Sequence, residues 1–354
     1  MRNLKILVFL LIFFSMSKSW GFHDQGVANC SGCHIIHNSE DGVLVDPNAP
    51  SGNIFSLKAE TASDVCLSCH ATQNGAVFGT DPLNPPAEKG AGNFVFLLED
   101  NINDKGNSAI IINGNSAGHN LNAPSRGVTT DPNYTTAPGG TMPSSMMGCT
   151  SCHDPHGNGN FRMLNGAGPI QDNSYIFTFD APLAEGIDLS TVESKTNHTA
   201  YISGMSEWCG NCHGASYHDN ESAGPTFDHP SPENLEPGMV TRYNTYNGTA
   251  DPNGTTVSLS YIPEVPFEDN ANTTSSTNGP SGASKVACIS CHRAHATSAP
   301  SAGRWDFNVQ FLDDDGALSG SYPIPNPYPD PSQNRLCNKC HPNMGSGGAI
   351  PNIN

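Results

Sequence analysis

One short stretch of the chain carries two cysteines and two histidines at spacings suited to binding a metal cofactor. Cys149 and Cys152 stand three apart, His153 follows directly, and His156 comes three residues later. Positions i, i+3 and i+4 of a helical turn lie on one face, so both thiols and the first imidazole would point at one group. Cys-x-x-Cys-His is the attachment signal for c-type haem, with two thioether bonds and an axial imidazole on the iron.

The second histidine of this stretch has a different role. His156 lies one turn beyond the iron ligand of its own site, and the porphyrin plane would separate it from the opposite face of that iron. We therefore expect His156 to bind the iron of a neighbouring haem, which implies a second haem close by.

The same pattern occurs six times and accounts for all 12 cysteines. A disulfide framework or paired zinc sites would not require a histidine after every second cysteine. We therefore predict six covalent c-type haems, at sites numbered 1 to 6 in chain order. Their attachment cysteines are Cys30 and Cys33, Cys66 and Cys69, Cys149 and Cys152, Cys209 and Cys212, Cys288 and Cys291, and Cys337 and Cys340. Their proximal iron ligands, in the same order, are His34, His70, His153, His213, His292 and His341.

The remaining histidines are numerous enough to supply a second axial ligand to every haem. Sites 1, 3 and 5, here called the odd sites, repeat the His-x-x-His arrangement, and sites 2, 4 and 6 are the even sites. Bis-histidine ligation fills both axial positions, so the pattern predicts electron transfer and no enzymatic bond chemistry. The eight histidines outside the proximal positions are His23, His37, His119, His156, His198, His218, His229 and His295.

The composition is unusual for a chain of this length. The 354 residues include 36 Gly and 28 Pro, and only 36% are hydrophobic. A chain this long usually buries a large core, but periodic apolar runs are missing. A disordered secreted protein would share this composition, whereas haems would replace the missing core. We predict a multihaem c-type cytochrome that is mostly coil, with short helices and a few small strands, organised around a stack of six haems.

The N-terminus resembles a secretory signal. Arg2 and Lys5 precede the apolar residues 6–14, and small residues follow near position 21. The apolar run is short for a membrane span, although an N-terminal anchor is the alternative reading. We expect residues 1–21 to be a signal peptide and residues 22–354 to form a single hexahaem domain. This domain would be secreted to the extracellular space or the outer cell surface of a bacterium.

The charge balance narrows the choice of partners. The formal net charge is −18, and removal of the signal, with its basic side chains, would leave the chain more acidic. Nucleic-acid binding requires a basic surface and is disfavoured. Cationic partners and metal ions fit better.

Local patterns predict a few elements between the sites. We expect brief strands at residues 93–98, 109–112 and 175–179. Ser63 and Asp64 before site 2, and Ser206 before site 4, are expected as helix caps. The first cysteines of successive sites are 36, 83, 60, 79 and 49 residues apart, which argues against a uniform repeat array.

These residues together resemble a known family, the filament-forming, outer-surface hexahaem c-type cytochromes of metal-reducing bacteria, or OmcS-type nanowire cytochromes. The intervening loops do not match. The matching stretches are residues 22–38, 118–120, 137–141, 149–157, 204–209, 229–230, 288–296 and 336–341.

The resemblance implies a coil-rich subunit with a continuous stack of six bis-histidine haems that polymerises head to tail. It also implies that His37 crosses the subunit interface and binds the haem held by Cys288, Cys291 and His292 of the next subunit. The distal ligands that match the family are His23, His37, His119, His156, His229 and His295. The choice among His23, His218 and His229 stays open, and His198 has no counterpart.

The predicted function is extracellular electron transfer by a polymeric cytochrome, a conductive filament subunit. Electrons would come from periplasmic or outer-membrane cytochromes and pass to metal oxides or cells. The alternatives are a monomeric periplasmic or surface electron shuttle and a multihaem reductase with one open haem. A Cys-x-x-Cys-Lys variant, which marks the open haem in nitrite reductases, is absent from the sequence.

Overall fold

The structure, a computed structural model, describes most of the chain after the predicted signal. The described residues are 29–72, 75–86, 89–99, 102–103, 111–170, 174–188, 191–214, 231, 233–246, 256–307, 309, 311–314, 327–328 and 336–341. The predicted signal peptide and His23, His218 and His229 lie outside them. No helix among the described residues is long and apolar enough to cross a membrane.

The described elements are short and joined by ordered coil, which confirms the predicted fold class. The α-helices are α2 (Ala62–His70), α3 (Cys149–Cys152), α4 (Met205–His213) and α5 (Pro237–Thr245). Four separate antiparallel hairpins pair β1 (Ser39–Glu40) with β2 (Val43–Leu44), β3 (Ile102–Asn103) with β4 (Ile111–Ile112), β5 (Gly168–Ile170) with β6 (Tyr175–Phe177), and β7 (Leu183–Glu185) with β8 (Ala200–Ser203).

Single turns of 3-10 helix provide much of the remaining regular structure. They are η2 (Cys30–Gly32), η3 (Ile54–Ser56), η4 (Phe94–Leu98), η5 (Gly114–Ser116), η6 (Pro124–Arg126), η7 (Ser144–Met146), η8 (Phe161–Met163), η10 (Val257–Leu259), η11 (Cys288–Ser290), η12 (Pro300–Ala302), η13 (Leu312–Asp314) and η14 (Leu336–Lys339). Each predicted haem site therefore begins on a helical turn: η2, α2, α3, α4, η11 and η14 in chain order.

Two of the expected strands are present and one is wrong. β4 occupies the described part of residues 109–112, and β6 occupies the first three residues of 175–179. Residues 94–98 form η4 instead, because the Asn93 side chain accepts the backbone N–H of Val95 at 3.0 Å and starts a helical turn. The apolar residues of this turn are consecutive and buried, so they lack the helical spacing that would predict a helix from the sequence.

The predicted helix caps are also wrong. Thr61 caps α2, since its hydroxyl accepts the backbone N–H of Asp64 at 3.0 Å. Gly204 starts α4 at φ 84°, a conformation that glycine adopts without strain. Ser63 and Ser206 therefore stand inside the first turn of their helices, where their hydroxyls are free for other contacts.

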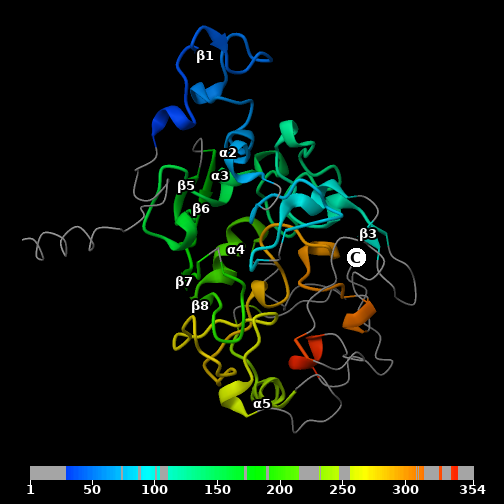
Figure 1. Ribbon diagram of the computed structural model, residues 1–354. Helices are drawn as coiled ribbons and strands as arrows, with labels where there is room; N and C mark the ends of the chain where they lie inside the picture. Colours follow the sequence, from blue (N-terminus) through cyan, green and yellow to red (C-terminus); the bar gives the residue numbers. More distant parts are fainter. Residues whose placement is uncertain are drawn as a thin grey trace, which may run out of the picture.

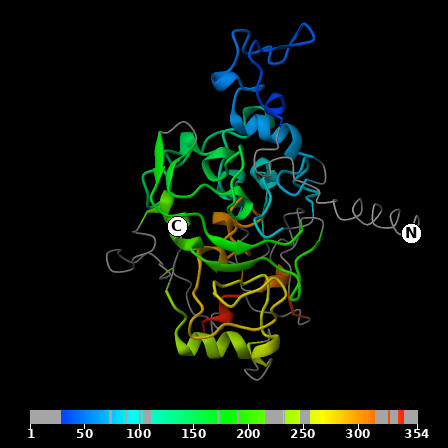
Figure 2. The same ribbon diagram turned by 90° about the vertical axis from the view of Figure 1, so that its left-hand side faces the viewer.

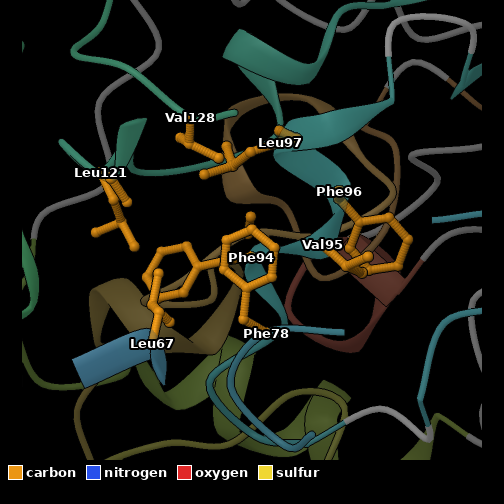
Figure 3. Close-up of a cluster of buried hydrophobic side chains, with 11 residues drawn as sticks. Leu67, Phe78, Phe94, Val95, Phe96, Leu97, Leu121 and Val128 are labelled. Carbon is orange, nitrogen blue, oxygen red and sulfur yellow. The ribbon is translucent and has the colours of Figure 1, made fainter. Parts of the chain in front are cut away.

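The buried side chains form four small clusters instead of one core. The first, shown in Figure 3, gathers Phe78, Phe94, Phe96 and Leu97 around Leu67 of α2, and Cys149 packs against it. The second contains Tyr243, Tyr261 and Trp305, with Cys291 of site 5 and both cysteines of site 6 packed against it. Trp208 lies between the third and fourth clusters. Apolar packing thus accompanies the attachment cysteines.

The predicted sites follow one another along the length of the molecule. The segment that carries site 1, blue in Figure 1, projects from one end, and Figure 2 shows it at the same end. α2 and α3 lie side by side below it, and α4 lies near the middle. α5 lies at the opposite end, with η14 of site 6 against it.

Removal of a large side chain from the first cluster should destabilise the protein. Phe96 is fully buried, so Phe96→Ala should lower the free energy of unfolding by about 3–5 kcal/mol. Chemical denaturation followed by far-UV circular dichroism would measure this. Leu83→Ala, at an exposed position, is the control and should change stability by no more than about 0.5 kcal/mol. Equal denaturation midpoints for the two variants would contradict the core role of Phe96.

Candidate haem-binding sites

Within the described residues, the cysteines form neither disulfides nor a cluster of metal ligands. All 12 are free thiols. Burial raises the pKa of Cys212 to about 12 and that of Cys340 to about 11. Among the described residues no three His, Cys, Asp or Glu side chains gather into a metal site. A haem needs only two protein ligands on its iron, so this donor set fits a haem.

The proximal imidazoles are oriented by backbone carbonyls. The Nδ1 atoms of the three odd-site ligands each lie 2.9 Å from a carbonyl oxygen, and His213 makes the same contact at 3.0 Å. Because a carbonyl only accepts, Nδ1 must carry the proton, which leaves Nε2 as the unprotonated nitrogen. Metal-binding histidines are commonly held in this way. The acceptors for His34, His153, His292 and His213 are the carbonyls of Phe55, Arg162, Ser301 and Pro138.

The three odd sites share one backbone conformation, which directs these carbonyls toward the imidazoles. At site 3, Arg162 and Met163 both adopt positive φ, 51° and 57°, at a cost of about 1–2 kcal/mol per residue. The N–H of Asp154 donates to Met163, and the N–H of Asn165 donates to Cys152, both at 2.8 Å. Sites 1 and 5 repeat this left-handed pair at Phe55 and Ser56 and at Ser301 and Ala302, with equivalent backbone hydrogen bonds.

These carbonyl acceptors were not found by sequence reasoning. Phe, Arg and Ser stand at the three equivalent positions, so residue type carries no signal. The contribution comes from the main chain, and non-glycine residues at positive φ are uncommon enough to mark a constrained site.

Two pairs of imidazoles face each other at separations that suit a shared iron. The ring centroids of His34 and His156 lie 6.3 Å apart with planes 7° from parallel. Those of His119 and His213 lie 5.8 Å apart. Two imidazoles on opposite sides of one metal ion, each with a metal–nitrogen bond of about 2 Å, have centroids about 6 Å apart. As expected, His156 lies opposite the ligand of another site and not of its own.

A third histidine of the predicted distal set is buried near a proximal ligand. His295 stacks on Phe94 with centroids 4.4 Å apart. Burial, followed by the charges of His153 and His119, lowers the pKa of His295 to about 3. His295 is thus a neutral imidazole close to His153 of site 3, the protonation state that a metal ligand requires.

His198 is a core residue with no nitrogen available for iron. Its Nδ1 lies 3.0 Å from the carbonyl of Thr199 and its Nε2 2.9 Å from that of Ser276. Its ring stacks on Tyr261 with centroids 3.9 Å apart. This placement agrees with leaving His198 out of the ligand set.

The remaining predicted ligands are less enclosed or lie outside the described residues. His37 is exposed on the projecting segment, and His70 ends α2. His341 is partly buried, and burial lowers its pKa. His23 and His229 are outside the described part of the chain.

A buried carboxyl group supports the helix that carries site 4. Glu268 is almost fully buried, and its Oε1 accepts the N–H of Met205 at 2.6 Å, at the start of α4. Its other oxygen has no hydrogen-bond partner. Burial raises the pKa of Glu268 above its ordinary value.

Comparisons with known proteins agree with this geometry. Residues 142–170, which contain site 3, match the family model described as a doubled CXXCH motif. The chain is 30% identical to the C-type cytochrome OmcS of Geobacter sulfurreducens, over 72% of this chain and 71% of the relative. Two solved structures of OmcS from that organism, described as nanowires and as an outer-membrane cytochrome filament, superpose with TM-scores of 0.74 and 0.75. They are 26% and 25% identical, and each comparison covers 90% of this chain and 99% of the other.

The facing imidazoles can be tested by removing one ring. His156→Ala should convert one of the six predicted haems from low-spin to high-spin, because the iron facing His34 would lose its second ligand. Visible absorption and electron paramagnetic resonance at full haem loading would measure this. His198→Asn is the control and should stay fully low-spin. A wholly low-spin His156→Ala protein would contradict the pairing.

The pKa of Glu268 predicts a dependence of stability on pH. The folded protein keeps a proton on this carboxyl group to a higher pH than the unfolded chain does, so stability falls as pH rises between the two pKa values. Glu268→Gln keeps an oxygen for the Met205 N–H and removes the titration. Its melting temperature should therefore fall less than that of the wild type from about pH 5 to about pH 8. Glu233→Gln, at an exposed position, is the control, and equal slopes for both variants would refute the prediction.

Proposed function

The chain belongs to the family of the C-type cytochrome OmcS, and from this premise we propose that it is the electron-transfer subunit of a homopolymeric extracellular filament. Each subunit would carry six covalent haems. The proposal rests on two kinds of support: the facing imidazoles within the subunit, and an exposed histidine, His37, on the segment that projects from its end.

The residues that would hold each haem follow from the six motifs. The two cysteines of a motif form the thioethers, the adjacent histidine binds one axial position, and a distal histidine binds the other. A haem held in this way stores and passes on one electron. Because both axial positions are filled, no iron coordination site is left for a substrate, so the subunit is proposed as a carrier and not as an enzyme.

The distal ligands follow a simple order along the chain. The extra histidine of site 3, His156, faces site 1, and that of site 5, His295, lies near site 3. Each odd site thus supplies the odd site before it. By the same order His37 of site 1 would supply a fifth site, and that site belongs to a neighbouring subunit.

Among the described residues, neither His37 nor His292 of site 5 faces a second imidazole. Within the described part of the chain, the ring of His292 contacts Phe307 and no histidine, and His37 is exposed. This is the observation that carries the filament proposal. A contact that joins different patches of successive subunits does not close on itself and builds a fibre.

The even sites suggest a parallel order. His119 lies before site 3 in the chain and faces His213 of site 4. We extend this order to His23 for site 2 and to His229 for site 6. These two assignments rest on sequence position alone.

The surface of the projecting segment also favours a protein partner. Ile36 is 83% exposed and Ile54 74%, and Val43 and Phe55 are exposed beside them. Apolar side chains gathered on one small segment are typical of an interaction site. A neighbouring subunit that receives His37 would cover them.

The location and the redox partners complete the proposal. The signal-like residues 1–21 would direct the chain out of the cytoplasm, and residues 22–354 would form the mature subunit outside the cell. Other cytochromes of the periplasm or outer membrane would supply electrons, and metal oxides or cells would accept them. The acidic surface is compatible with cationic partners and unfavourable for nucleic acid.

The interface histidine gives a direct test. His37→Ala should keep six haems per chain but form no filaments in electron micrographs. One haem of the released subunit should be high-spin, because the fifth site receives no second ligand. Added imidazole should make this haem low-spin without restoring filaments. Intact filaments of this variant would contradict the interface role, and a wild-type protein that stays monomeric would favour a soluble electron shuttle.

A further inference from the structure

Two pairs of haem sites are joined by the same side-chain contact. At the first joint, the hydroxyl of Ser63 in α2 accepts the backbone N–H of Cys149 at 3.2 Å. At the second, the hydroxyl of Ser206 in α4 accepts the backbone N–H of Cys288 at 3.1 Å. Both serines are buried, and each stands three residues before the first cysteine of its own site.

The cysteines at each joint also meet. The Cys66 thiol lies close enough to that of Cys149 to interact with it, and this interaction together with burial raises the pKa of Cys66. The Cys209 thiol contacts that of Cys288 in the same way. The first cysteines are 83 residues apart at one joint and 79 at the other. The chain therefore contains two copies of one unit, in which an even site is followed by an odd site.

The physical role of the serine follows from the start of the next site. The first N–H groups of a helical turn have no partner inside that turn, and α3 and η11 are single turns that begin at Cys149 and Cys288. The serine oxygen satisfies this donor. It is free to do so because Thr61 and Gly204 occupy the cap positions of α2 and α4.

We propose that Ser63 and Ser206 are positioning residues that set the mutual orientation of neighbouring haems, at sites 2 and 3 and at sites 4 and 5. This rests on the proposed function, which assigns haems to these cysteines. Each hydroxyl holds the first cysteine of an odd site against the first cysteine of the preceding even site. Since the thioether bonds tie each haem to these cysteines, a shift of the joint moves one haem relative to the other.

Three substitutions at the joints, combined with a matched control, test the proposal. Ser63→Ala and Ser206→Ala remove the hydroxyl, and Ser63→Thr keeps it. Ser68→Ala is the control, because Ser68 lies in the same helix and its hydroxyl contacts only that helix. It donates to the carbonyl of Val65 at 2.7 Å and lies 3.7 Å from the sulfur of Cys69, and neither contact reaches site 3. Ser206 also contacts the hydroxyl of Ser231, so the Ser63 joint is the cleaner of the two.

The measurement is the exciton couplet in the Soret circular dichroism of the fully loaded protein, which reports the relative orientation of coupled haems. Each alanine variant should lose part of the couplet amplitude while haem content and the low-spin spectrum stay as in the wild type. The two losses should add in the double variant, because the joints lie at different places in the molecule. Ser63→Thr should restore the wild-type couplet, and Ser68→Ala should not change it.

The outcomes separate this proposal from the proposed function. A wild-type couplet in both alanine variants would overturn the positioning role and leave the cytochrome assignment standing. An equal loss in Ser68→Ala would also overturn it, because the effect would then belong to the helix and not to the joint. Absence of haem from the wild-type cysteines of these sites would instead overturn the proposed function itself.

Discussion

The arrangement of the odd sites depends on a hydrogen bond between an imidazole and a backbone carbonyl. His34, His153 and His292 each present Nδ1 to a carbonyl at 2.9 Å. This bond selects the tautomer and leaves Nε2 free to face a metal. Two consecutive residues at positive φ aim each carbonyl. Such strain persists only where the surroundings hold it, and here the backbone hydrogen bonds on both sides of the site do so.

Links between distant segments explain how a chain so rich in coil keeps a defined structure. The four hairpins are small, and the buried side chains form separate clusters beside the attachment cysteines. Neither provides a continuous core. Covalent attachment and iron ligation at six places would join distant segments instead. Long loops are uncommon in compact proteins, and these links would hold them in place.

The sites also form a two-site repeat that irregular spacing concealed. The intervals of 83 and 79 residues separate equivalent joints, whereas the intervals of 36, 60 and 49 residues cross loops of different length. Such a repeat leaves an unmatched odd site at one end of the chain and an unmatched even site at the other. In the proposed filament, a neighbouring subunit at each end would supply the missing partner site. The two-site repeat therefore agrees with the proposed electron-transfer filament.

Motif spacing predicts every attachment cysteine and proximal histidine, because i, i+3 and i+4 positions converge within a single helical turn. It also predicts that His156 serves a site other than its own. The partner of His156, the carbonyls behind the odd-site imidazoles and the roles of Ser63 and Ser206 emerged only from the folded chain. His156 meets His34 through the side chains of two segments far apart in the sequence, and motif spacing does not say which two sites pair. The carbonyl and serine contacts each involve a main-chain atom, and main-chain atoms are the same whatever the side chain.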